Sequence, residues 1–364
     1  MELKYKPDIE QTLKRHEMWW NREDFGRCAI SINAPNDNPP KNPPPELPSK
    51  VDDRWLDFDY IKESAEHRLS SHSFLADSLP VWHGGYPGHE IISAFLGCDV
   101  TFSEHTGWIH PIIADGSLSD YNPNDIVKID PNNHWWQHSQ KFHKFMNECA
   151  AGNSFPATPA FSSVGDILAD MRTSNNLLFD LLESPEMVKK FEDKIVTLWT
   201  EVFDHYYDLH KDYSFGGNVP WLGVWAPGKC YIPQNDFSIM ISTQMFEEIF
   251  FDALTRKINF LDYSIYHLDG VDAFRHTDLL CSIEKLNGIQ VLPGAGKPSP
   301  LHYMEVLKKV QSAGKNLHIS ISPDEVKFAL DSLSSKGLFI ETWIQTEAEG
   351  AELLQLVEKY SRFI

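Results

Sequence analysis

The sequence contains no run of eighteen apolar residues, so it predicts no membrane-spanning helix. Basic residues are also scarce, because 32 lysines and arginines stand against 52 aspartates and glutamates and the formal net charge is −20. Proteins that bind nucleic acid contact its phosphates through clustered lysines and arginines, so this balance argues against a nucleic-acid partner. The first residues lack the apolar segment of a secretory signal, and we therefore expect a cytoplasmic protein.

The residue spacings of several common sites are missing as well. The five cysteines lie far apart with no Cys-x-x-Cys pair, which excludes the spacing of a zinc ribbon and of a disulfide framework. No glycine-rich dinucleotide fingerprint follows a predicted strand, since the nearest cluster, Gly294-Ala295-Gly296, lacks the third glycine. A Rossmann cofactor site is therefore not expected.

The first 75 residues differ from the rest in composition. Residues 9–22 have the apolar spacing of an amphipathic helix, and residues 28–33 have the composition of a strand. Prolines then crowd residues 35–48, where their fixed φ angles and missing N–H groups exclude a helix or a central strand. We therefore expect an N-terminal extension of helical and proline-rich segments, residues 1–75, packed on a domain formed by residues 76–364.

From about residue 155 onward, short apolar runs alternate with long amphipathic segments. The predicted strands are 219–225, 263–268, 288–294, 316–320 and 338–342, and the predicted helices are 59–75, 176–210 with a break at 184–185, 242–257, 276–286, 300–313, 323–335 and 347–361. Four strand–helix pairs in succession imply parallel strands joined by right-handed crossovers. In a chain of 364 residues this pattern favours an α/β fold of the (β/α)8 TIM-barrel type over an open doubly wound sheet.

Polar residues lie where the predicted strands end, which is where a barrel gathers its catalytic groups. Residues 266–270 read Tyr-His-Leu-Asp-Gly, and in an extended chain His267 and Asp269 point to the same face. Such a pair suits metal binding, proton transfer or the binding of a polar substrate, and it equally suits a buried histidine bonded to its own strand-end carboxylate. The other polar candidates at strand ends are Gln290, His318, Ser320, Glu341 and, from an earlier strand, His83.

An ordered series of segments covers about residues 80–361: 165–172 with 176–181, 234–238 with Ser242 and Phe246, 266–270, 289–294 and 336–342. In this order they resemble the uroporphyrinogen decarboxylase superfamily, which comprises the haem-pathway decarboxylase and zinc-dependent methyltransferases that act on corrinoid proteins or coenzyme M. The segment around Trp19-Trp20-Asn21-Arg22 is similar to the corrinoid-associated branch. The resemblance implies a barrel that moves a methyl group to or from a corrinoid protein or a small thiol or amine.

The family's functional markers differ in this chain. The methyltransferases carry a His-x-Cys on this strand and a second cysteine after the last strand, whereas Asp269 and Ile344 occupy those positions here. A zinc–thiolate site therefore cannot form from these positions, but a site of nitrogen and oxygen ligands, His267, Asp269 and Glu341, is open to zinc or another divalent metal. Residues 31–36 also lack the arginines with which the decarboxylase binds its substrate carboxylates, which argues against uroporphyrinogen decarboxylation.

Three functions stay open at this stage. The first is a methyltransferase with a separate corrinoid protein as partner, in which His267 is a ligand or proton donor and Asp269 and Glu341 are the carboxylates. The second is a decarboxylase or other lyase acting on a porphyrinogen-like or small carboxylic acid, bound by Arg172 or Arg275. The third is a non-catalytic barrel that binds a ligand. The residues expected to line the site for a small-molecule substrate are His83, Trp82, Trp225, Tyr266, Gln290 and His318.

Overall fold

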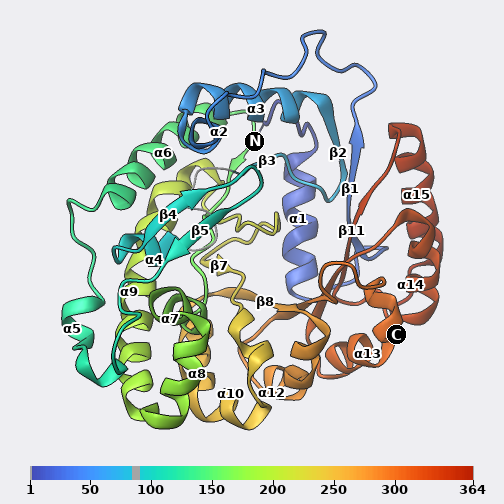
Figure 1. The fold of residues 1–364 in the computed structure, drawn as a ribbon. Coiled ribbons are helices and arrows are strands. Elements are labelled where there is room, and N and C mark those ends of the chain that lie inside the picture. The colour runs from blue at the N-terminus through green and yellow to red at the C-terminus, as the bar shows by residue number, and fades with distance from the viewer. Residues whose placement is uncertain (1, 84–90, 364) are drawn as a thin grey trace.

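A seven-stranded sheet forms the centre of the molecule (Figure 1). The computed structural model describes residues 2–83 and 91–363. In spatial order the strands are β2 (His72–Ala76), β1 (Ala29–Pro35), β11 (Leu338–Trp343), β10 (Asn316–Ser320), β9 (Gly288–Leu292), β8 (Tyr263–Asp269) and β7 (Cys230–Tyr231). Neighbouring strands from β1 to β7 run parallel, and β2 pairs with β1 in the antiparallel sense. The carboxyl ends of the parallel strands therefore lie on one side of the sheet.

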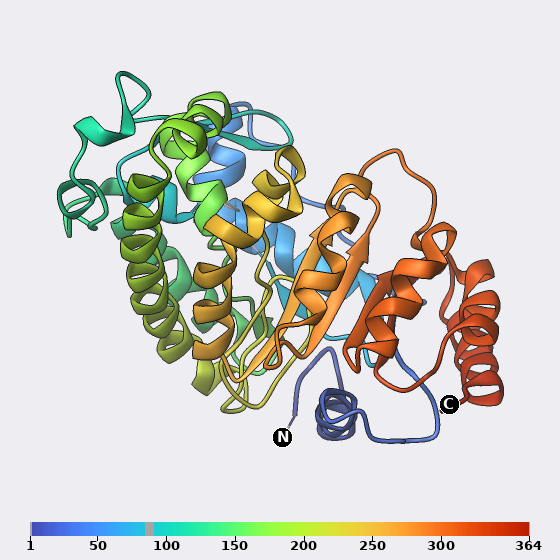
Figure 2. The ribbon, with the colours of Figure 1, turned by 90° about the horizontal axis from the view of Figure 1, so that it is seen from below.

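Helices lie around these strands in both views of the ribbon (Figures 1 and 2). They are α1 (Ile9–Trp20), α2 (Val51–Leu56), α3 (Phe58–Ser71), α4 (Ile91–Phe95), α5 (Pro123–Ile126), α6 (His134–Ala150), α7 (Val164–Arg172), α8 (Ser174–Glu183), α9 (Pro185–His210), α10 (Thr243–Ile249), α11 (Phe251–Phe260), α12 (Thr277–Cys281), α13 (Met304–Ser312), α14 (Val326–Ser332) and α15 (Glu347–Tyr360). Shorter strands complete the fold: β3 (Val81–Trp82), β4 (Asp99–Phe102), β5 (Gly107–His110) and β6 (Phe155–Pro156). Among the described residues, no helix is both long and apolar enough to cross a membrane.

Alternation along each parallel strand separates the two faces of the sheet. In β10, Leu317 and Ile319 are buried in the large core that the sheet shares with the helices, and α9 adds Ile195 to the same core. Side chains of successive strand residues point to opposite faces, so His318 and Ser320 face away from that core. The same alternation in β1, β8, β9 and β11 leaves one face of the sheet for polar groups.

Helix α1 lies against the amino end of the parallel strands, and Figure 2 shows it end-on beside the strand ends. Trp19 and Trp20 are buried together with Ala29 at the start of β1 and Phe339 near the start of β11. The Trp20 indole N–H also donates a hydrogen bond to the Trp225 carbonyl at 2.9 Å. The amino end of the sheet is thus filled with aromatic side chains.

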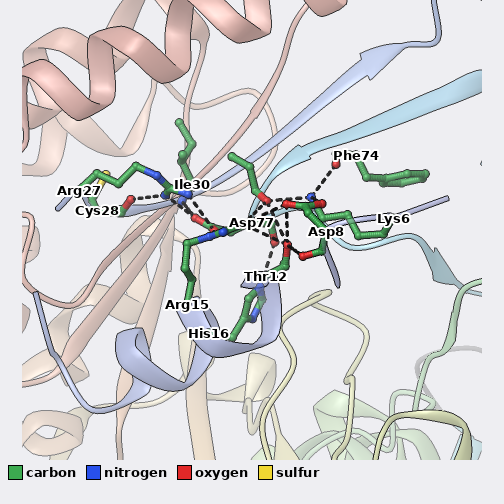
Figure 3. Close-up of polar contacts among 11 residues, drawn as sticks. Lys6, Asp8, Thr12, Arg15, His16, Arg27, Cys28, Ile30, Phe74 and Asp77 are labelled. Carbon is green, nitrogen blue, oxygen red and sulfur yellow. Dashed lines mark hydrogen bonds and ion pairs between the residues drawn. The ribbon is translucent and has the colours of Figure 1, made fainter. Parts of the chain in front are cut away.

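A buried network of charges joins α1 to the sheet (Figure 3). The Asp77 carboxylate is 1% exposed and accepts hydrogen bonds from both terminal nitrogens of Arg27, from Arg15 Nε and from the backbone N–H of Ile30. Burial alone raises the pKa of Asp77, but the Arg27 and Arg15 guanidinium groups hold that pKa well below its usual value. The charge of Asp77, the residue after β2, is therefore bonded to α1 and to the start of β1.

The structure confirms an α/β fold with a central parallel sheet. Strands β3 and β6 form a separate parallel pair, and the closed (β/α)8 ring stays a prediction. Residues 1–75, expected as an extension packed on the remainder, also contribute strands to the sheet, because residues 29–33 of β1 pair with residues 339–343 of β11. The predicted break at 184–185 separates α8 from α9.

One predicted element is wrong in type, and another has the wrong C-terminal boundary. Residues 219–225 form no strand, and the pairings described near them are isolated bridges of Pro220 with Thr158 and of Asn218 with Ala226. The backbone packs tightly here, since a Cβ at position 217 would lie 2.2 Å from the Ala226 carbonyl oxygen. The predicted helix 59–75 ends early, because α3 stops at Ser71 and the next residues form β2.

Candidate functional site

Two rows of side chains cross the sheet on the face turned away from the large core. Paired residues of parallel strands point to the same face, and the alternate residues of these strands lie in the core shared with the helices. The first row, nearer α1, consists of Ala29, Phe339, His318, Gln290 and His267 in successive strands. The second row, two residues further along each strand, consists of Ser31, Glu341, Ser320, Leu292 and Asp269. The polar candidates Gln290, His318, Ser320, Glu341, His267 and Asp269 therefore share one surface near the carboxyl ends of the strands.

His267 is held in one orientation by its neighbours on the sheet. Its Nδ1 lies 2.5 Å from Gln290 Oε1 on the adjacent strand, so Nδ1–H donates to the amide oxygen and Nε2 carries the lone pair. Nε2 lies 3.9 Å from Asp269 Oδ2, and the imidazole is 11% exposed. The indole of Trp221 meets the imidazole edge to face at 5.2 Å between ring centroids. A histidine so placed can accept a proton at Nε2 next to a carboxylate that stabilises the resulting charge.

His318 lies beside Gln290 in the first row and is only 1% exposed. Its ring stacks on Phe339 with 5.1 Å between centroids, and its Nδ1 has no hydrogen-bond partner among the described residues. Burial, and then the nearby His267, lower the pKa of His318 to about 3. His318 therefore stays uncharged near neutral pH and presents a neutral ring to the site.

Glu341 occupies the second row between Ser31 and Ser320. Burial raises the pKa of its carboxyl group above the usual value. Within the described residues, this carboxyl group forms no hydrogen bond or ion pair. A half-buried carboxylate without a partner is costly, so Glu341 favours either its protonated form or a cation beside it.

Three aromatic candidates lie outside this surface. Tyr266 precedes His267 in β8, so it points to the opposite face and is buried in the large core. Trp82 packs among side chains of α3 and α6. Trp225 is buried at the amino end, where its indole N–H donates to a backbone carbonyl at 2.8 Å. The remaining candidate, His83, directly follows β3 and borders residues 84–90, which lie outside the described residues.

The structure adds two residues that the sequence did not indicate. Trp221 contacts His267 from the irregular segment 218–226, where no periodic pattern marks its position. Ser31 joins the second row because β1 pairs with β11, a pairing between segments some 300 residues apart. The alternation of residues 28–33 places Ser31 on one face of its strand. The sequence alone does not show that β11 is the neighbouring strand, so it does not place Ser31 beside Glu341.

The donor set for a metal is small. Among the residues that the structure describes, no three histidine, cysteine, aspartate or glutamate side chains are grouped to hold one ion. His267 and Asp269 supply two donors 3.9 Å apart, and Glu341 is not grouped with them. Catalytic zinc sites use three protein ligands, and His267 and Asp269 are the two candidate ligands that lie close together. The predicted metal site of His267, Asp269 and Glu341 stays a prediction, which a measurement of the metal content of the purified protein would test.

No family model matches the sequence, and no curated protein matches it. Among solved structures, a methyltransferase from Methanosarcina mazei is similar, with a TM-score of 0.58 over 96% of this chain and 98% of that chain. The two sequences are 10% identical, so the similarity concerns the fold alone. The chain therefore has, over nearly its whole length, a fold similar to that of a methyltransferase.

Proposed function

We propose that the protein is a methyltransferase whose reaction takes place at the two polar rows, with His267 as the general base. The orientation of His267 carries this proposal, because Gln290 fixes the ring by accepting from Nδ1–H and leaves Nε2 free beside Asp269. The similarity in fold to a methyltransferase over 96% of the chain supports an enzyme of this class.

The proposed chemistry requires a base of this kind. A thiol or a protonated amine becomes a nucleophile only after it loses a proton, and His267 Nε2 takes that proton. The freed electron pair of the acceptor then forms a bond to the methyl carbon, while the bond from the donor to that carbon breaks and its electron pair stays with the donor. The Asp269 carboxylate stabilises the imidazolium that is formed, at a distance of 3.9 Å from Nε2.

We propose that a corrinoid bound to a separate protein gives or receives the methyl group, as the resemblance to the uroporphyrinogen decarboxylase superfamily implies. A methylated corrinoid docked on this face would supply the methyl group that the acceptor takes. Support for a protein partner comes from exposed apolar side chains near the carboxyl ends of the strands: Trp343 at the end of β11 is 58% exposed, and Ile239 and Met240 follow β7 with 44% and 45% exposed. Ile239 and Met240 are adjacent in the chain, whereas Trp343 lies at the end of β11, which β10, β9 and β8 separate from β7, so these side chains form two separate exposed positions.

The lyase alternative has less support from the geometry. Arg172, one residue proposed to bind an acid, already donates to both carboxylate oxygens of Asp180 and is buried. Arg275 donates to the Asp272 carbonyl and pairs with the carboxylate of that residue at 3.5 Å. Arg172 is therefore not available to a substrate carboxylate without losing Asp180, and Arg275 belongs to an exposed surface pair outside the two polar rows.

A methyl-exchange assay tests the proposal. The purified protein is mixed with methylcob(III)alamin and a panel of thiols and amines, and methylated products are measured by mass spectrometry. We expect His267→Ala to lower the transfer rate about 10²- to 10⁴-fold, the usual contribution of a general base. The matched control is His105→Ala, since His105 is an exposed histidine in the turn between β4 and β5. Equal, measurable rates in wild type and His267→Ala would contradict the role of His267 as the base, and an absence of transfer by both proteins would favour the non-catalytic barrel.

A further inference from the structure

The second row holds two carboxyl groups and no basic side chain. Glu341 lies on β11 and Asp269 on β8, so β9 and β10 separate them and the two groups stand on either side of His318 and Gln290. Neither of the two rows contains a lysine or an arginine. Carboxylates on one face of a sheet add their fields and attract cations.

Both carboxyl groups lack a charged partner of their own. Asp269 Oδ1 is buried without a hydrogen-bond partner among the described residues, and Oδ2 reaches only His267 at 3.9 Å. Glu341 makes no hydrogen bond or ion pair there. Asp77 is different, because its carboxylate accepts hydrogen bonds from the guanidinium groups of Arg27 and Arg15. Asp77 is thus paired within the fold, whereas neither carboxyl group of the second row has a lysine or arginine partner among the described residues.

Two further groups extend this surface. His318 is 1% exposed with an unpartnered Nδ1 in the adjacent row, and its neutral ring adds a hydrogen-bonding atom without adding positive charge. Trp221 adds an indole 5.2 Å from the His267 ring. His267 thus has the Asp269 carboxylate on one side and the Trp221 ring on another, and carboxylates and aromatic faces are the groups that bind ammonium ions.

We infer that the substrate of this site is a cationic amine, either a primary ammonium or an N-methylated ammonium compound. This inference rests on the proposed function, and it selects the amine from the thiols and amines that the proposed chemistry allows. Asp269 binds the ammonium charge next to His267, and His267 takes the proton when the amine is the methyl acceptor. Glu341 lies three strand spacings away, about 14 Å along the sheet, and adds to the negative field on the same face. An anionic substrate would meet two carboxylates and no positive side chain in the rows.

Binding measurements with matched ligands test the inference without requiring turnover. Isothermal titration calorimetry compares methylammonium with methanol, and choline with its uncharged carbon analogue 3,3-dimethylbutan-1-ol. The anion 3,3-dimethylbutanoate completes the set. We expect at least one cation to bind about tenfold more tightly than its neutral analogue, and the anion not to bind, because a desolvated charge and a cation–π contact each favour the cation.

Variants locate the effect. Glu341→Gln and Asp269→Asn keep side-chain size and remove one charge each, and either is expected to weaken cation binding about tenfold or more while leaving binding of the neutral alcohol unchanged. Glu104→Gln, at an exposed glutamate between β4 and β5, is the control and should change neither. The inference is overturned if no cation binds more tightly than its neutral analogue, or if both variants bind cations like the wild type.

The inference and the proposed function fail in different ways. If the cations bind but wild type and His267→Ala both transfer no methyl group, the proposed function is wrong and the ligand class stands. If thiols are methylated in a reaction that depends on His267 while no cation binds, the proposed function stands and this inference is wrong.

Discussion

Removing the charge of Asp77 should destabilise the protein strongly without touching the candidate site. Asp77→Asn keeps the size of the side chain, but it removes the charge that Arg27 and Arg15 share and turns an amide N–H₂ toward groups that are themselves donors. Arg27 is 7% exposed and cannot exchange this partner for water, whereas Arg15 is 21% exposed and partly can. Breaking a buried ion pair in this way costs about 3–5 kcal/mol.

Urea unfolding followed by circular dichroism measures that loss. The control is Asp252→Asn, because Asp252 is 81% exposed and pairs with Arg256 on the helix surface, where such pairs contribute about 0–1 kcal/mol. The pH dependence gives a second measure. The folded pKa of Asp77 is lowered, so its contribution is present above the unfolded value of about 4 and is lost as pH falls below it. A loss below about 1 kcal/mol for Asp77→Asn at pH 7 would refute the reasoning.

Three further outcomes follow from the same physical arguments. Glu341→Gln should raise the thermal stability at pH 8 but not at pH 4. The folded-state pKa of Glu341 is raised, so the contribution of this carboxyl group to the free energy of unfolding falls as pH rises through that pKa. An equal effect of the substitution at both pH values would contradict this reasoning. Lys257 is buried, and desolvation lowers its pKa to about 7. The free energy of unfolding of the wild type should therefore rise between pH 7 and 10 by up to about 1.4 kcal/mol per pH unit. Lys257→Met should abolish that rise in urea titrations. Gln290→Leu should lower methyl transfer about 10- to 100-fold with an unchanged circular dichroism spectrum, because Nδ1 of His267 loses its acceptor and the ring loses its fixed tautomer; an unchanged rate would remove Gln290 from the site.

The C-terminal half of the fold could be predicted from the sequence because its strands and helices have clear periods. The strand predicted at 316–320 is β10 itself, and the helix predicted at 347–361 is α15 to within one residue. The segment 219–225 could not be predicted, because its apolar residues fill space around Gly217 and Trp225 without pairing as a strand. Local composition gave no sign of that packing.

The site was predictable only where it depends on alternation within one strand. His267 and Asp269 share a face for that reason, and the opposite placement of Tyr266 follows from the same rule. The hydrogen bond from His267 to Gln290 depends on the register of β8 against β9, which the sequence does not specify. The contact of Trp221 with His267 depends on an irregular segment and lay beyond any periodic pattern.

The most direct test of the account is the rate of methyl transfer by His267→Ala with and without added imidazole. The substrates are methylcob(III)alamin and the amine that binds most tightly, and single-turnover product formation is followed by mass spectrometry. The account predicts a rate about 10²- to 10⁴-fold below that of wild type and His105→Ala, with part of the loss restored by free imidazole, which replaces the missing base. A His267→Ala variant that transfers methyl groups as fast as the wild type would contradict the central claim.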